Sequence, residues 1–536
     1  MMVSVVSALP EALSIVFSWP AFELLVAGVV FGITLGAIPG IGSVIGMAVM
    51  LPLTLPLSGA EALIFLTAVY SGAMYGSSVA AILINVPGTP ASAASIYDGY
   101  PLTKQGKAKD ALAISATSSA LGGTTTMVAL FVITPLVSSI VLLFGTPHIF
   151  LVTILGIIMI AVIAAQGSTI KGVLSGAFGL LIMTLGTAPT TPVSRYMFDT
   201  SLLLSGLSFV AILLGVFAIA EMIRIIDIEG GTAAEIAELG GNTVRGIQMV
   251  LANKLLMLRS SFLGMGIGSL PGAGGAVSNF IAYAVEVQRS DDPDSYGTGN
   301  PRGLIATESS NNGTVAGSLI PVLSFGIPGS PSTAILLGAF LIHGIDPGPT
   351  LLENSLGLIY ALIVSLIVSN VLIIVVGLML IAPFGYKISL VDTRYIVPII
   401  VVLAALGTIS LRSNPIDLLT ILVFGIIGLL MKRYDYSIVA LVLGAVLGTL
   451  SERTLNRSLL LSDGSLSIFV GDPLAILLVS LIVGILLVPV LQETDPSGPF
   501  VIQPECPRKY LYISLKAISQ KLHYMVRFVT YWATSS

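Results

Sequence analysis

The chain has 536 residues, of which 55% are hydrophobic and 9% are charged, and its formal net charge is −4. A soluble domain carries about 25% charged residues, so this composition excludes an ordinary soluble protein and favours a chain embedded in lipid. The near-neutral charge gives no reason to expect a nucleic-acid partner, and the single cysteine, Cys506, excludes an internal disulfide.

Long stretches without Asp, Glu, Lys or Arg follow one another along the chain. They cover residues 24–60, 62–97, 111–170, 200–220, 260–285, 309–345, 354–386 and 473–492, and shorter apolar runs lie at 395–411, 418–431 and 436–451. A membrane-spanning helix needs about 20 mostly apolar residues, so several stretches have room for two spans. We therefore predict an all-α polytopic membrane protein with about 12 transmembrane segments.

The polar breaks suggest how the chain is organised. Charged loops are expected at 97–110 and 286–308, and the mixed-charge stretch 224–259 divides the chain near its middle. We predict a first transmembrane repeat over 20–230, a second over 231–460, a terminal transmembrane segment over 461–495 and a basic tail over 496–536. The tail is either an amphipathic segment on the membrane or a partly disordered terminus.

Two motifs occur twice, which predicts an internal duplication. Residues 36–42 (GAIPGIG) and 268–274 (GSLPGAG) both read G-x-x-P-G-x-G, at an offset of 232 positions (268 − 36). Seven further identities share an offset of 241 (328 − 87): they pair Gly72, Gly76, Ser77, Pro87, Gly88, Pro90 and Ala93 with Gly313, Gly317, Ser318, Pro328, Gly329, Pro331 and Ala334. Carriers built from such repeats often have halves of opposite orientation, and we expect that here.

The duplicated motifs place Pro-Gly inside apolar runs. Proline removes a backbone donor and breaks or kinks a helix, and glycine adds backbone freedom. Interrupted backbone at membrane depth is tolerated where protein or a water-filled cavity surrounds it. Transporters use such breaks to bind substrates near the midplane, and the N-termini of half-helices favour anions. The duplicated breaks therefore predict a secondary transporter.

The predicted site residues belong to these breaks and to their polar neighbours. The predicted substrate-binding residues are Asn85, Pro87, Gly88, Thr89, Pro90, Ser92, Pro328, Gly329, Ser330, Pro331 and Thr333. A cation-coupling or hinge role is predicted for Pro39, Gly40, Gly42, Pro271, Gly272, Gly274, Asn311 and Asn312.

Other interpretations of these positions stay open. The glycines Gly72, Gly76, Gly313 and Gly317 also fit close packing of helices. A Pro-Gly pair also fits the end of a loop, and the asparagines also fit helix caps.

Several of these segments resemble one family, the large membrane subunit of the tripartite tricarboxylate transporters. The likeness is carried by the paired G-x-x-P-G-x-G blocks, by 85–90 (NVPGTP) and above all by 308–349 (ESSNNGTVAGSLIPVLSFGIPGSPSTAILLGAFLIHGIDPGP). Residues 195–198 (RYMF) and 214–221 (LGVFAIAE) resemble the family as well, and the likeness covers roughly 20–460.

The resemblance implies a location in the inner (plasma) membrane and two partner proteins. The partners are a small four-helix membrane subunit and an extracytoplasmic solute-binding protein, which delivers citrate or another di- or tricarboxylate. Co-transported sodium ions or protons would drive uptake, with no other cofactor or metal expected. The sequence accordingly lacks a G-x-x-x-x-G-K-[ST] phosphate loop.

A mechanism follows from the charges around the breaks. No Lys or Arg lies within ten residues of either P-G-[ST]-P block, so helix ends and the co-transported cation must balance the charge of the anion. We expect the two blocks to face one another, with backbone N–H groups and the hydroxyls of Thr89 and Ser330 on the carboxylate oxygens. Carbonyls freed at the P-G-x-G motifs, with Asn85 and Asn312, would coordinate the cation.

Three other classes of membrane protein compete with this hypothesis. An ion channel also uses broken helices, but it cannot concentrate its cargo. An intramembrane enzyme needs ionisable residues inside the bilayer, and the charge-free stretches offer almost none, so we expect no enzyme. The duplicated interrupted helices argue against a purely structural membrane subunit, which stays open as an alternative together with the channel.

Overall fold

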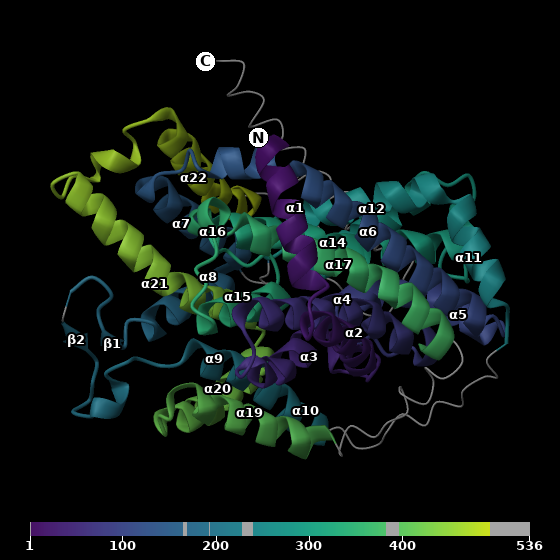
Figure 1. Cartoon of the computed structure of the whole chain (residues 1–536), viewed down its shortest axis with the longest axis horizontal. Coiled ribbons are helices and arrows are strands. Elements are labelled where there is room, and N and C mark those ends of the chain that lie inside the picture. The colour runs from purple at the N-terminus through teal and green to yellow at the C-terminus, as the bar shows by residue number, and fades with distance from the viewer. Residues whose placement is uncertain (1, 164–168, 192, 228–239, 382–395, 494–536) are drawn as a thin grey trace.

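The computed structural model describes residues 2–163, 169–191, 193–227, 240–381 and 396–493, and helices fill most of this length (Figure 1). The predicted basic tail over 496–536 lies outside the described residues. The helices up to residue 227 are α1 (Met2–Val16), α2 (Ala21–Gly36), α3 (Gly42–Met50), α4 (Gly59–Ile84), α5 (Ile96–Lys104), α6 (Ala108–Val141), α7 (Thr146–Ile163), α8 (Thr169–Ile182), α9 (Phe209–Leu213) and α10 (Ala220–Asp227).

The remaining helices follow from residue 243 onward. They are α11 (Thr243–Ala252), α12 (Lys254–Gly268), α13 (Gly274–Gln288), α14 (Pro301–Phe325), α15 (Pro331–Ile342), α16 (Pro349–Asn354), α17 (Leu356–Val376), α19 (Ile396–Arg412), α20 (Ile416–Arg433), α21 (Ile438–Leu461) and α22 (Pro473–Glu493). Short 3-10 turns are η1 (Leu51–Thr54), η2 (Ala91–Ser95), η3 (Ser201–Leu203), η5 (Pro293–Ser295) and η8 (Leu466–Phe469), and π turns are η4 (Leu214–Ile219) and η6 (Gly377–Ile381).

Four helices in the described part of the chain are long and apolar enough to cross a membrane. They are α4, α6, α21 and α17 with its continuation to Met379. The bent pairs α1–α2 (67°) and α11–α12 (78°) raise the number to six if each pair is one span. An all-α membrane protein is thus confirmed, while the count of about 12 segments stays a prediction.

The four helices α4, α6, α14 and α17 occupy the middle of the molecule (Figure 1). Helix α4 starts in a capping box, in which the Ser58 N–H donates to the Glu61 carboxylate (2.9 Å) and the Ser58 hydroxyl caps the first turn. Helix α14 starts at Asn300, whose side chain accepts the Arg302 N–H (2.9 Å). Both helices are buried along nearly their whole length.

Glycines let each of these two helices lie against a shorter one. A Cβ built on Gly72 of α4 would be 2.7 Å from the Val29 carbonyl oxygen of α2, and one on Gly313 of α14 would be 2.5 Å from the Ser261 carbonyl oxygen of α12. Gly76 and Gly317 approach the same partner helices. The helix-packing interpretation of these glycines therefore holds.

The loops that precede α4 and α14 each lie against a loop of the other half. Near the start of α14, the Gln105 side-chain amide donates to the Thr298 carbonyl (2.7 Å), and Asp98 accepts backbone N–H groups of the 297–300 loop. Near the start of α4, a Cβ built on Gly59 would be 2.8 Å from the Ile345 Cδ1. The loop after α5 therefore lies beside the loop before α14, and the loop after α15 beside the start of α4.

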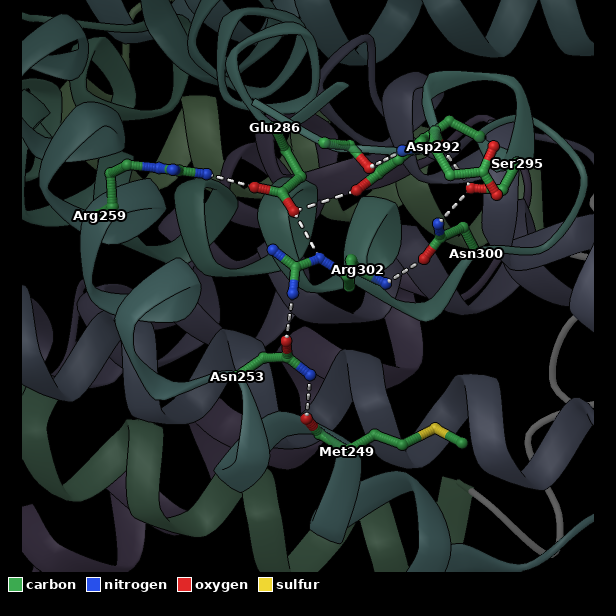
Figure 2. A network of polar contacts seen from close by, with 10 residues as sticks. Met249, Asn253, Arg259, Glu286, Asp292, Ser295, Asn300 and Arg302 are labelled. Carbon is green, nitrogen blue, oxygen red and sulfur yellow. Dashed lines mark hydrogen bonds and ion pairs between the residues drawn. The ribbon is translucent and has the colours of Figure 1, made fainter. Parts of the chain in front are cut away.

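The polar loop predicted over 286–308 is shorter in the structure, since α14 begins at Pro301. Its edge is held by Glu286 of α13, which binds Arg259 of α12 and Arg302 of α14 (Nε–Oε1 2.7 Å) (Figure 2). The Tyr296 hydroxyl donates to the same carboxylate (3.0 Å), and Arg302 also reaches the Asn253 side chain (2.9 Å). This cluster, the Glu286 cluster, fastens α12, α13 and α14 together. The loop predicted over 97–110 likewise contains α5.

One small sheet adds to the predicted helices. Strands β1 (Gly186–Thr187) and β2 (Ser194–Arg195) pair antiparallel, Gly186 opposite Arg195 and Thr187 opposite Ser194. The Arg195 guanidinium forms two bonds to the Glu452 carboxylate of α21 (2.8 and 3.0 Å). The bidentate ion pair ties the hairpin, which projects from one side in Figure 1, to the helical body.

Candidate functional site

The two P-G-x-G motifs form the turns between α2 and α3 and between α12 and α13. Gly40 and Gly42 have φ angles of 82° and 54°, and Gly272 and Gly274 have φ angles of 83° and 56°. A residue with a side chain is strained at such angles, so each turn depends on its glycines. The turns that follow Pro39 and Pro271 thus share one backbone conformation.

The two P-G-[ST]-P segments follow α4 and α14. Helix α4 ends at Asn85 with φ of 60°, and α14 ends at Gly326 with φ of 67°, which is the left-handed conformation that closes a helix. Asn85 is exposed. Its observed role is therefore the helix cap, one of the interpretations that the sequence left open.

The hydroxyls predicted to bind substrate make reciprocal caps after each break. The Thr89 N–H donates to the Ser92 Oγ and the Ser92 N–H to the Thr89 Oγ1, both at 3.2 Å. The Ser330 N–H donates to the Thr333 Oγ1 (2.8 Å) and the Thr333 N–H to the Ser330 Oγ (3.2 Å). The first pair spans the start of η2 at Ala91, and the second opens α15.

Within each half, the two breaks touch. The Gly272 N–H donates to the Gly329 carbonyl (3.1 Å) in the second half. In the first half, a Cβ built on Gly42 would be 2.5 Å from the Gly88 carbonyl oxygen. The P-G-x-G turn and the P-G-[ST]-P segment, predicted separately, therefore form one cluster in each half.

Polar side chains connect the clusters across the halves. The Ser43 and Ser332 hydroxyls lie 3.0 Å apart, and the Tyr70 hydroxyl is 3.2 Å from that of Ser318 and 3.3 Å from that of Ser330. In the opposite direction, the Asn279 side chain donates to the Ala91 carbonyl (2.9 Å). Among the described residues, no hydrogen bond joins Thr89 to Ser330, so the clusters meet through these neighbours.

The asparagine pair on α14 points in two directions. The Asn311 side chain donates to the Met74 carbonyl (3.0 Å) and accepts from Asn279 (3.1 Å), so it joins α4 to α13. The Asn312 side chain donates to the Asn370 Oδ1 of α17 (3.1 Å), and its own buried Oδ1 has no partner in the described part of the chain. Asn311 thus belongs to the contact between the clusters, and Asn312 offers a free acceptor beside α17.

The two P-G-[ST]-P segments differ in exposure. Asn85 and Pro90 are exposed and the four residues between them are partly exposed, whereas Pro328, Gly329 and Ser330 are buried. One break therefore opens outward while its counterpart is enclosed.

Sequence reasoning missed three polar residues that the structure brings to this region: Tyr70, Asn279 and Glu308. Asn311 stands 241 positions after Tyr70 (311 − 70), and both cross to the other half, but a search for identical residues overlooks a Tyr–Asn pair. Asn279 lies in an otherwise apolar run, which was a usable signal.

Interrupted helices from both halves, meeting through polar side chains inside a helical membrane protein, define the architecture of a membrane transport protein. The chain belongs to the tripartite tricarboxylate transporter TctA family, whose sequence profile matches residues 22–443. It is thus a membrane subunit of the tripartite transporters, as the resemblance indicated.

Two relatives come from Agrobacterium vitis. One is an uncharacterised 52.8 kDa protein of the TAR-I ttuC′ 3′ region, 36% identical over 452 residues, which are 84% of this chain and 89% of the relative. The other is an uncharacterised protein of the TAR-II ttuC′ 3′ region, 36% identical over 215 residues, which are 40% of this chain and 88% of the relative. No solved structure matches the chain.

Proposed function

We propose that this chain is the translocating subunit of a transporter that imports a di- or tricarboxylate, driven by a sodium or proton gradient. The main support is the pair of helix breaks whose hydroxyls cap the backbone, at Thr89–Ser92 and at Ser330–Thr333. Each of these breaks contacts a P-G-x-G turn. Backbone N–H groups at a helix start bind carboxylate oxygens without a basic side chain. A carboxylate held there needs a co-transported cation to balance its charge.

The proposal includes the partners and the location that the family pattern implies. An extracytoplasmic solute-binding protein would deliver the carboxylate, and a small four-helix membrane subunit would complete the complex in the inner membrane. Selectivity among carboxylates would then reside largely in the binding protein.

We infer further that the two halves are inverted repeats related by a pseudo-two-fold axis. Contacts recur in swapped pairs: the loop 298–300 meets 102–105 as Gly59 meets Ile345. Likewise Ser43 meets Ser332 as Gly275 meets Ala91. Reciprocal contacts of this kind are the mark of two-fold pairing.

Cysteine labelling tests the inverted arrangement in a Cys506→Ser background. Lys104→Cys and Thr298→Cys should react with an impermeant maleimide from one side of the membrane. Pro56→Cys and Asp346→Cys should react from the other. Labelling of all four positions from the same side would refute the inversion.

Uptake into proteoliposomes tests the transport proposal. The chain is reconstituted with the small subunit, the binding protein loaded with labelled citrate is added, and a sodium or pH gradient is applied. Accumulation above the outside concentration supports a secondary transporter. If the internal concentration of carboxylate only reaches the outside concentration, the chain acts as a channel. If no carboxylate enters the proteoliposomes, the chain is a structural subunit.

The hydroxyl assignment has its own test. Thr89→Ala and Ser330→Ala should raise the KM of uptake at unchanged expression, and Thr89→Ser and Ser330→Thr should restore it because they keep hydroxyl and cap. Loss of the cap alone costs about 1 kcal/mol of stability and would lower the Tm without raising the KM. Wild-type KM in both alanine variants would remove the hydroxyls from the site.

A further inference from the structure

The carboxylate of Glu308 is buried in the middle of the molecule. The sequence places it at the end of the predicted loop 286–308, but α14 begins at Pro301, so Glu308 lies about two turns inside the helix. Its exposed fraction is 0%. Around it α14 packs against α6, α12, α13 and η2.

Hydroxyl groups surround this carboxylate. The Ser115 and Ser119 hydroxyls of α6 donate to its Oε2 at 2.8 and 3.0 Å, and the Ser95 hydroxyl donates to its Oε1. Ser95 is also 3.2 Å from the Thr307 hydroxyl. All three donors come from the first half, whereas Glu308 belongs to the second.

Glu308 differs from every other buried carboxylate in the described part of the chain. The others have cationic or backbone N–H partners: Glu286 with Arg259 and Arg302, Glu221 with Arg224 and Lys432, Asp417 with Arg412, Asp110 with Arg245 and the Asn242 N–H, and Asp98 with three N–H groups of the 297–300 loop. Glu308 has hydroxyl partners and, among these residues, no ion pair with Lys, Arg or His.

A buried charge without a cationic partner is strongly disfavoured, so this carboxyl needs a positive ligand. The ligand that fits the geometry is a proton. The Ser115 and Ser119 oxygens are in direct hydrogen-bond contact with the carboxyl, whereas a coordinated metal ion would hold these oxygens apart. Three hydroxyls can donate to the ionised group, and each can turn to accept from the protonated one, so both states find partners.

Few other groups near Glu308 can take part in its titration. Tyr75 of α4 lies within electrostatic range, and its buried hydroxyl has no hydrogen-bond partner in the described residues. Asp98 of α5 and Asp110 of α6 are engaged with the 297–300 loop and with Asn242. On α12, Arg259 is engaged with Glu286 of α13. Asp98, Asp110 and Arg259 are therefore engaged with other groups, and the buried Tyr75 hydroxyl is unpaired among the described residues.

We propose that Glu308 is the proton-binding site that couples a proton gradient to carboxylate import, an inference that rests on the proposed function. Proton binding forms an O–H bond on the carboxyl and takes its charge from −1 to 0, and release reverses both. The link to the substrate is Ser95, the last residue of η2, which directly follows the break at Pro87–Pro90. Protonation of Glu308 changes its hydrogen bond with Ser95, and this change shifts the conformation of the break that precedes η2.

The carboxyl occurs in one half alone. The position 241 before Glu308 (308 − 241) is Thr67, whose hydroxyl lies 3.4 Å from that of Ser365. The duplication supplies this position in both halves, but the first half has Thr67 there and the second half has the titratable Glu308. We therefore predict that one proton binds at this position in each transport cycle.

Glu308→Gln in the reconstituted complex tests the coupling. Accumulation driven by a pH gradient should fall at least tenfold, while exchange of labelled for unlabelled carboxylate continues, because the glutamine mimics the protonated carboxyl. Glu353→Gln, at an exposed carboxyl of α16, is the matched control and should accumulate normally. Full pH-driven accumulation by Glu308→Gln, or wild-type accumulation that follows a sodium gradient and ignores pH, would overturn the proposal.

Infrared difference spectroscopy tests the proton site without any substrate. The purified wild-type chain should show a protonated carboxyl C=O band that disappears as the pH is raised and is missing in Glu308→Gln. An identical band in both proteins would overturn the proposal whatever the transport result. Absence of carboxylate exchange in the wild type would instead refute the proposed function, and the spectra would still decide on the proton.

Discussion

The hydroxyls of Ser43 and Ser332 lie 3.0 Å apart, although 289 positions separate them in the chain. Ser43 follows the first P-G-x-G turn and Ser332 follows the second P-G-[ST]-P segment. The corresponding positions on the other side are Gly275 and Ala91, where a Cβ built on the glycine would be 2.9 Å from the Ala91 Cβ. The contact between the halves is thus made twice, once between hydroxyls and once between small residues.

A disulfide across this contact is our first prediction. In a Cys506→Ser background, Ser43→Cys with Ser332→Cys should cross-link under mild oxidation, because side chains this close fall within the reach of a disulfide. Mass spectrometry of the linked peptides measures the yield. The single variants Ser43→Cys and Ser332→Cys control for adducts between molecules, and unlinked peptides in the double variant would contradict the arrangement.

Two glycines on α12 should respond differently to alanine. A Cβ on Gly264 would be 2.9 Å from the Ser310 Cα of α14, whereas a Cβ on Gly266 meets nothing within 4 Å. Gly264→Ala should lose about 1–3 kcal/mol through overpacking, and Gly266→Ala should gain about 0.5–1 kcal/mol through helix propensity. Thermal unfolding in detergent compares the two, and equal Tm values would argue against the close helix contact.

The Tyr70 hydroxyl should matter more for transport than for folding. Tyr70→Phe removes the hydrogen bonds to Ser318 and Ser330, which lowers the free energy of unfolding by about 0.5–1.5 kcal/mol. The Ser330 cap of α15 thereby loses its hydrogen bond to α4. We expect a raised KM for carboxylate with the Tm lowered by a few degrees at most. Tyr360→Phe, at a buried tyrosine of α17, is the control, and equal KM values in the two variants would show that the Tyr70 hydroxyl has no part in the site.

The Glu286 cluster should stabilise the second half without affecting substrate affinity (Figure 2). Glu286→Gln leaves Arg259 and Arg302 without their carboxylate, and because both arginines reach solvent we expect a loss of about 1–3 kcal/mol. Hydrogen exchange of the 286–302 segment should speed up while the KM stays constant. An unchanged exchange rate would mean that the ion pairs do not hold the loop.

Local chemistry made much of the candidate site predictable. The Pro-Gly pairs at Pro39-Gly40 and Pro87-Gly88 favour a break in a helix through local backbone chemistry, so these turns could be predicted from the residues alone. The caps after the breaks follow from a hydroxyl three residues before another, as in Ser330 and Thr333. The predicted roles of these residues in binding stay predictions.

Contacts between distant segments were beyond the reach of sequence reasoning. Nothing local in Tyr70 says that it will reach Ser330, because the contact depends on how α4 crosses α15. Glu308 was hidden for another reason: the polar residues up to Arg302 look like one loop with it, and only the start of α14 at Pro301 separates them. The number of membrane segments was equally inaccessible, since helices such as α3 and α15 are too short to be counted by length.

The unequal exposure of the two P-G-[ST]-P segments has a consequence for how the carrier would cycle. Segments of matching sequence and matching caps occupy an open environment at Asn85–Pro90 and a closed one at Gly326–Ser330. In an inverted duplication, exchanging these two environments produces the molecule open to the opposite side. Each half of the structure would then show the conformation that the other half adopts in the second state of the carrier.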